Sequence, residues 1–167
     1  MVSGSRSIIV PLIANARNIM TAQSYSTTFT VDQTPEEAFK AITNVRGWWS
    51  EEIEGDTEKV GDEFTYIYKD EHRCRMRLTE LVPGKKAVWH VLDNYFSFVG
   101  DKTEWIGNEL IFDISEKNGE TEIYFTQLGL VPEYECFDVC SNAWGFYVKT
   151  SLRSLITTGK GRPNIKD

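Results

Sequence analysis

Residues 133–158 read EYECFDVCSNAWGFYVKTSLRSLITT, and their pattern determines the architecture of the chain. Its apolar residues recur at intervals of three and four, which predicts one long amphipathic helix. The inward stripe consists of Phe137, Cys140, Trp144, Val148, Ser151 and Leu155, widened by Cys136, Ala143, Tyr147 and Leu152. Gly159, Gly161 and Pro163 then end the helix. A stripe this wide needs burial along its whole length, so the rest of the chain must supply a surface that covers it.

The residues before this helix have the alternating pattern of antiparallel strands. Residues 73–78 place an arginine at every second position and an apolar side chain between, which predicts an exposed basic face and a buried inner face. Pro83-Gly84 and Asn118-Gly119 predict turns. The other strand-like runs are residues 25–31, 64–69, 87–91, 108–114 and 121–128.

A helix start follows the first of these strands. Thr34 can cap it, Pro35 fits its first turn, and the two acidic residues that follow suit the positive end of its dipole. Gly47 is predicted to stop this helical region. The fold class is therefore α+β: a curved antiparallel sheet of about six to seven strands wrapped around the C-terminal helix, with two short helices after the first strand.

Composition bounds the function classes. The chain has 167 residues, enough for one domain, and a net charge of −7, which disfavours nucleic-acid binding. Its three cysteines are an odd number in a chain of low cysteine density, which suits a reducing, cytoplasmic compartment. Cys136 and Cys140 are interpreted as small buried side chains, because a disulfide across one helical turn would strain the helix.

The N-terminus differs from the rest of the chain. Arg6 and the short apolar run of residues 8–13 outline a signal peptide, although Pro11 interrupts the run, and Met20 is an alternative true start. We expect residues 1–23 to be a flexible extension or a mis-assigned start, residues 24–163 one domain, and residues 164–167 a tail. No other stretch has the length that a membrane span requires.

Several phrases of the sequence resemble the SRPBCC or START-like superfamily, and more closely the family of activator of heat-shock protein 90 ATPase homologues. They are Thr34-Pro35-Glu36-Glu37-Ala38-Phe39, Gly47-Trp48-Trp49, Thr103-Glu104-Trp105-Ile106-Gly107, Phe125-Thr126-Gln127-Leu128-Gly129-Leu130-Val131-Pro132, Gly145-Phe146-Tyr147, Ser151-Leu152-Arg153-Ser154-Leu155-Ile156 and Gly159-Lys160-Gly161-Arg162-Pro163. The resemblance covers residues 24–163 and implies the helix-grip fold. It also implies binding of lipids, hormones, polyketides or aromatic metabolites, or a co-chaperone role. Members often have His-Glu where this chain has Gln127-Leu128, so any catalysis that uses that histidine is absent here.

Aromatic residues at inward positions are predicted to line a cavity between sheet and helix. Trp144 and Tyr147 are expected in its wall, and the buried amide of Gln127 is expected to bond either the following loop or a ligand. The aromatic segment of residues 93–107 is expected to be a loop that forms the rim. The predicted ligand-binding residues are Trp48, Trp49, Tyr66, Tyr68, Trp89, Trp105, Phe112, Phe125, Gln127, Trp144 and Tyr147.

Three functions remain open at this point. The first is binding of a hydrophobic small molecule, lipid-like or aromatic, without catalysis. The second is a protein-interaction module that acts on an ATPase chaperone, and the third is a cyclase- or hydrolase-like enzyme. The sequence contains no Ser/His/Asp set, glycine-rich phosphate loop or metal-ligand spacing, so we predict no catalytic residues, no metal and no cofactor.

Overall fold

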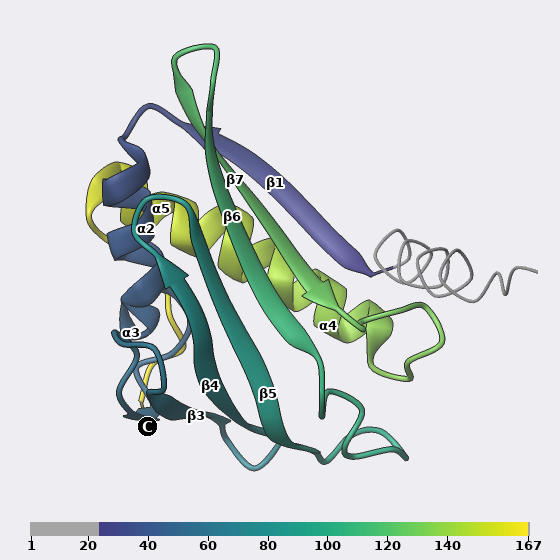
Figure 1. The fold of residues 1–167 in the computed structure, drawn as a ribbon. Coiled ribbons are helices and arrows are strands. Elements are labelled where there is room, and N and C mark those ends of the chain that lie inside the picture. The colour runs from purple at the N-terminus through teal and green to yellow at the C-terminus, as the bar shows by residue number, and fades with distance from the viewer. Residues whose placement is uncertain (1–23, 167) are drawn as a thin grey trace, which may run out of the picture.

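Residues 24–166 are described by the computed structural model, and the predicted N-terminal extension, residues 1–23, lies outside the described residues. Seven strands form one antiparallel sheet in the order β1-β7-β6-β5-β4-β3-β2, and the C-terminal helix lies across one of its faces (Figure 1). The strands are β1 (Tyr25–Val31), β2 (Ile53–Gly55), β3 (Glu63–Tyr68), β4 (His72–Val82), β5 (Lys86–Phe96), β6 (Glu109–Lys117) and β7 (Glu120–Leu128). The predicted α+β helix-grip fold is confirmed.

Two short helices follow β1, as predicted: α2 (Pro35–Thr43) and α3 (Val45–Trp48). The start of α2 is a complete capping box, in which Thr34 Oγ1 accepts from the Glu37 N–H and Glu37 Oε2 accepts from the Thr34 N–H. The prediction that Gly47 stops the helical region is wrong, because α3 runs through it. Gly161 passes close to this helix, since a Cβ added at Gly161 would lie 2.2 Å from the Gly47 carbonyl oxygen.

The C-terminal helix consists of α4 (Phe137–Trp144), a π-helical segment η1 (Gly145–Leu152) and α5 (Arg153–Thr158). Residues 140, 144, 148, 152 and 156 are buried along it. A spacing of four overshoots an α-helical turn by about 40°, so this row would wind away from the sheet on a regular helix. The wider turns of η1 reverse that drift in the middle of the helix and keep the row facing the sheet. Gly159 ends the helix in a left-handed conformation, with φ of 82°.

The centre of the molecule is filled with aromatic rings. All five tryptophans are buried in one continuous cluster, with Trp48 and Trp89 at its centre. Their ring centroids lie 6.1 Å apart, and the chain of contacts continues through Trp49 to Trp144, at 4.9 Å, and from Trp144 to Trp105, at 5.8 Å. The helix therefore covers a sheet whose concave face is already packed over much of its length.

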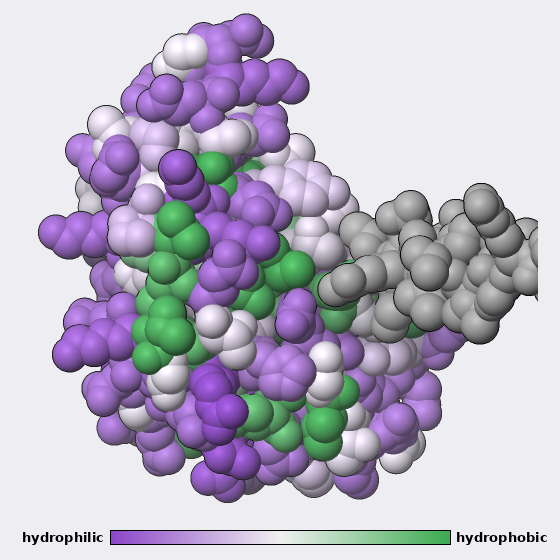
Figure 2. Space-filling model, in the orientation of Figure 1, coloured by the Kyte–Doolittle hydropathy of each residue, from purple (hydrophilic) through white to green (hydrophobic). Residues whose placement is uncertain are grey.

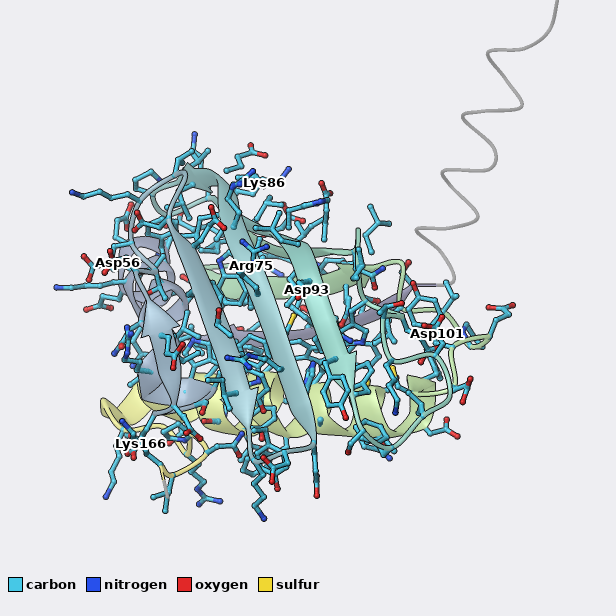
Figure 3. The ribbon with its side chains drawn as sticks, turned by 90° about the horizontal axis from the view of Figure 1, so that it is seen from below. Asp56, Arg75, Lys86, Asp93, Asp101 and Lys166 are labelled. Carbon is cyan, nitrogen blue, oxygen red and sulfur yellow. The ribbon has the colours of Figure 1, made fainter. Side chains whose placement is uncertain are left out.

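The outer face of the sheet is mainly hydrophilic, with hydrophobic residues in small groups (Figure 2). The arginines of residues 73–77 are exposed there, as predicted, and Glu63 accepts hydrogen bonds from both Arg75 and Arg77. Figure 3 shows Arg75 on β4 beside its register partner Asp93 on β5. Within residues 24–166, no helix combines the length and hydrophobicity needed to cross a bilayer.

A candidate ligand cavity

One aromatic cavity, of about 220 Å³, lies at the end of the sheet where β3 and β5 finish and β4 begins. Its walls come from these strands, from the segment after α3, from the β5–β6 loop and from α4 and η1. The predicted site residues among its walls are Trp49, Tyr66, Tyr68, Trp105, Trp144 and Tyr147. The structure thus brings the predicted helix wall, the predicted rim and part of β3 together around one hollow.

The other predicted site residues lie outside this cavity, and their side chains are fully enclosed. They are Trp48, Trp89, Phe112, Phe125 and Gln127, each with at most 1% of its surface exposed. The stacked indoles of Trp48 and Trp89 fill the part of the cup where a larger hollow would otherwise lie. These residues shape the cavity from behind and do not line it.

The size of the cavity limits what can enter it. Pockets for drug-sized ligands usually have volumes of about 300–1,000 Å³, whereas an apolar cavity of about 150 Å³ holds benzene. At about 220 Å³ this cavity has room for one ring or two fused rings. A larger depression of about 670 Å³ beside α2 is bordered by charged side chains such as Lys40 and Arg46 and lacks aromatic walls.

Gln127 belongs to a buried hydrogen-bond chain behind the cavity. The indole N–H of Trp144 donates to Gln127 Oε1 at 2.7 Å, and Gln127 Nε2 donates to Asn108 Oδ1 at 3.0 Å. Asn108 Nδ2 in turn donates to the hydroxyl of Tyr134 at 3.0 Å. The amide therefore bonds two side chains and not the following loop, and it fixes the Trp144 ring that forms the cavity wall.

Asn164 links the two tyrosines of the cavity. The Tyr147 hydroxyl donates to Asn164 Oδ1 at 2.7 Å, and Asn164 Nδ2 donates to the Tyr66 hydroxyl at 2.9 Å. Burial raises the pKa of both Tyr66 and Tyr147, so both remain protonated at neutral pH. Asn164, the first residue of the predicted tail, also pairs through its backbone with Trp49 and Glu51.

His72 is a half-buried imidazole in the cavity wall. Its ring centroid lies 4.4 Å from that of Phe96, 4.8 Å from that of Trp105 and 5.2 Å from that of Tyr66. Burial among these rings lowers the pKa of His72 to about 4, and this effect outweighs a hydrogen bond that His72 donates to Asn94 Oδ1, which favours the charged form. The imidazole is therefore neutral at pH 7.

The mouth of the cavity is formed partly by the β5–β6 loop. Phe98 from this loop is 44% exposed, and Val139 of α4, which also lines the cavity, is 57% exposed. The loop is shorter than predicted, because β5 continues to Phe96. Of the aromatic residues expected at the rim, Phe96, Phe98 and Trp105 line the cavity, whereas Tyr95 is exposed and lies under Lys102.

Two carboxylates hold the β5–β6 loop against the start of α4. Glu104 accepts hydrogen bonds from the backbone N–H groups of Glu135 and Cys136, at 2.7 and 3.1 Å. Glu135 accepts from the backbone N–H groups of Gly100 and Asp101, at 2.9 and 3.2 Å. Figure 3 shows Asp101 in this loop, next to the segment that leads into α4. The reciprocal arrangement fixes the rim of the cavity.

His72 and Cys140 are wall residues that the sequence did not assign to the site, whereas Phe96 and Phe98 were expected as part of the rim segment. The signal for His72 was present, because it has the same parity as the inward side chains of Cys74 and Met76 on β4. Cys140 was assigned to the inward helix stripe, and all three cysteines are buried and unpaired as disulfides. The interpretation of Cys136 and Cys140 as small buried side chains is confirmed.

No family model matches the sequence, and no curated protein matches it. The fold is similar to that of the Aha1 dimer from Colwellia psychrerythraea, with 21% identity and a TM-score of 0.66 over 83% of this chain and 98% of that one. MLL2253 from Mesorhizobium loti is 13% identical, with a TM-score of 0.61 over 75% of this chain and 91% of that one.

DynU16, from the dynemicin biosynthetic locus, is 14% identical, with a TM-score of 0.63 over 86% of this chain. This chain spans about half the length of DynU16, since the match covers 51% of that protein. At these identities the three likenesses establish the shared architecture and nothing finer.

Proposed function

We propose that this chain, which has the SRPBCC/Aha1-like helix-grip fold, binds a small hydrophobic molecule in the cavity between its sheet and its C-terminal helix. The observation that carries the proposal is the cavity itself, about 220 Å³ lined mainly by aromatic side chains. Such a lining would cost free energy if left in water, and an apolar ring that entered it would remove that area from solvent.

The expected affinity follows from the area that one ring can bury. An aromatic ring system of about 150 Å² would gain about 4 kcal/mol at about 25 cal/mol per Å², which corresponds to a dissociation constant near 1 mM. Polar contacts would add to this value. We therefore expect simple one-ring compounds to bind weakly, and a natural ligand to exceed them through hydrogen bonds that fix its orientation.

The first test is native mass spectrometry of freshly purified protein, in which a co-purifying small molecule would identify the ligand class. A variant that fills the cavity supplies the second. Ala143 lies half-buried in the wall, so Ala143→Phe should occupy the hollow and weaken binding of a one-ring or two-ring aromatic at least tenfold by calorimetry. Val60→Phe is the matched control, because Val60 is 59% exposed and lies outside the cavity.

If Ala143→Phe binds such aromatics as tightly as Val60→Phe, the ligand does not occupy this cavity. If no aromatic binds the unaltered protein and none co-purifies, the proposal of small-molecule binding fails. The filled aromatic centre and the exposed Phe98 and Val139 then favour the second candidate, a module that binds a protein partner through its surface.

An enzymatic role has one observation in its favour, namely a titratable group with a perturbed pKa in the cavity wall. A general base works best when its pKa is close to the working pH, however, and the pKa of His72 is lowered to about 4. At neutral pH His72 is a weak base that accepts a hydrogen bond and seldom takes the proton. This favours binding over catalysis at the same site.

A further inference from the structure

The side chain of Asn94 has a fixed orientation. It is 3% exposed, and its Nδ2 donates to the carbonyl oxygen of Lys102 at 3.2 Å. The nitrogen of the amide is therefore directed at an acceptor, and Oδ1 is directed at Nε2 of His72, 2.9 Å away. Because Oδ1 can only accept, Nε2 of His72 carries the proton.

This arrangement sets the tautomer of His72 and makes Nδ1 an acceptor. A neutral imidazole has one N–H and one lone pair, so the lone pair is on Nδ1. Within residues 24–166 no hydrogen-bond donor pairs with Nδ1. The atom is also not fully enclosed, so a small molecule can reach it. The rings of Phe96 and Trp105 hold the imidazole in place, so the lone pair has a constant position in the wall.

Three other polar groups of the wall either have partners or can only donate a hydrogen bond. Tyr66 and Tyr147 are bonded to Asn164, and the enclosed indole N–H of Trp105, which has no hydrogen-bond partner within residues 24–166, can only donate. Among the described wall residues, Glu71 is the one with a charge at neutral pH, and it is exposed at the mouth. An anionic ligand would therefore meet a carboxylate and no cation.

We infer that the cavity selects uncharged aromatic compounds that carry an N–H or O–H group, and that His72 Nδ1 accepts the hydrogen bond from this group. The inference rests on the proposed function, since it concerns the ligand of the same cavity. His72 is the specificity-determining residue, and Asn94 is a positioning residue that acts through it.

Indole and benzofuran form the test pair, because they have nearly the same shape and only indole has an N–H. We expect calorimetry to show indole binding about tenfold tighter than benzofuran to the unaltered protein. In His72→Phe the affinity for indole should fall to that for benzofuran, while benzofuran should bind as before.

Asn94→Asp tests the positioning role. A buried carboxylate beside the imidazole favours its charged form, in which both nitrogens donate, so the preference for indole should disappear. Nitrogen NMR of the His72 ring gives a readout that a structural role would leave unchanged. In the unaltered protein the chemical shift of Nδ1 should be that of an unprotonated nitrogen. This resonance should move on addition of indole and should move little on addition of benzofuran.

The outcomes separate this inference from the proposed function. Equal affinities for the two compounds, unchanged in His72→Phe, would overturn the role of His72 and leave aromatic binding in the cavity intact. Binding of neither compound would overturn both. A protonated Nδ1 in the free protein at neutral pH would overturn the assigned tautomer and, with it, the selection for donors.

Discussion

Gln127 illustrates how one residue joins the core to the site. It is fully buried on β7, and its amide connects the indole of Trp144 to the side chain of Asn108. Inward parity on the strand made its burial predictable, but both partners are distant in sequence, by 17 and 19 residues. Alternation fixes the face on which a side chain lies, whereas the identity of its partner depends on how helix and sheet meet.

Gln127→Leu should lower the free energy of unfolding by about 3 kcal/mol. The substitution keeps the volume but leaves the Trp144 N–H and the Asn108 oxygen buried without partners, at about 1–3 kcal/mol each. Urea denaturation measures the change. Glu120→Leu, at an exposed position of the same strand, serves as control and should change the value by about 0.5 kcal/mol or less. A small loss in Gln127→Leu would mean that water replaces the amide.

At the scale of elements, the β5–β6 loop and the start of α4 form one unit through Glu104 and Glu135. Each carboxylate accepts hydrogen bonds from two backbone N–H groups of the other segment. Each therefore caps backbone donors that have no partner in a helix or strand. The backbone N–H groups of Glu135 and Cys136, just before α4, are thereby satisfied from a different part of the sequence.

We expect the free energy of unfolding to fall by about 1 kcal/mol in Glu104→Ala and by about 1 kcal/mol in Glu135→Ala. The loss in the double variant should be smaller than the sum of the two single losses, by about 0.5 kcal/mol or more. The reason is that the loop is already partly released once one carboxylate is gone. A double-mutant cycle in urea measures the coupling, and Glu133→Ala, an exposed neighbour, is the control. Strict additivity of the two losses would show that the two carboxylates act independently.

The sequence predicted some elements well and others poorly, for physical reasons. The start of α2 and the turn at Asn118-Gly119 were predicted correctly, because capping residues and turn residues are local signals. Asn118 and Gly119 both have positive φ in the turn. The three residues of β2 and the π-helical turns of η1 were not predicted. Both depend on contacts made by other elements: β2 pairs with β3, and η1 fits the curvature of the sheet.

The same distinction applies to the site. Periodicity placed Trp144 and Tyr147 in the helix wall of the cavity, where the structure has them. It could not separate wall from core among inward aromatic residues, because Trp89 and Tyr66 have equivalent patterns. Trp89 lies against Phe112 at the centre of the sheet, and Tyr66 lies near its end. Position along the curved sheet decides between the two roles.

For the whole molecule, proton binding at His72 links the cavity to stability. The folded-state pKa is about 4 and the ordinary value is 6.5, so between these pH values the unfolded chain binds the proton more readily. The stability that comes from a neutral His72 is complete above pH 6.5 and is lost as the pH falls toward 4.

His72→Phe removes this titration and leaves the carboxylates in place. The stability of the unaltered protein relative to the variant should therefore rise from pH 4 to pH 6.5, by at most about 3 kcal/mol. Urea denaturation at a series of pH values gives this difference directly. A difference that stays constant over the interval would show that His72 titrates in the folded protein as it does in the unfolded chain.

The connected tryptophan cluster has a consequence for optical measurements. Excitation absorbed by any of the five indoles can pass along the chain of contacts from Trp48 and Trp89 to Trp49, Trp144 and Trp105. The last three border the cavity. Emission from the whole set should therefore respond to a single compound entering the hollow, so the protein carries its own fluorescent reporter and needs no attached dye.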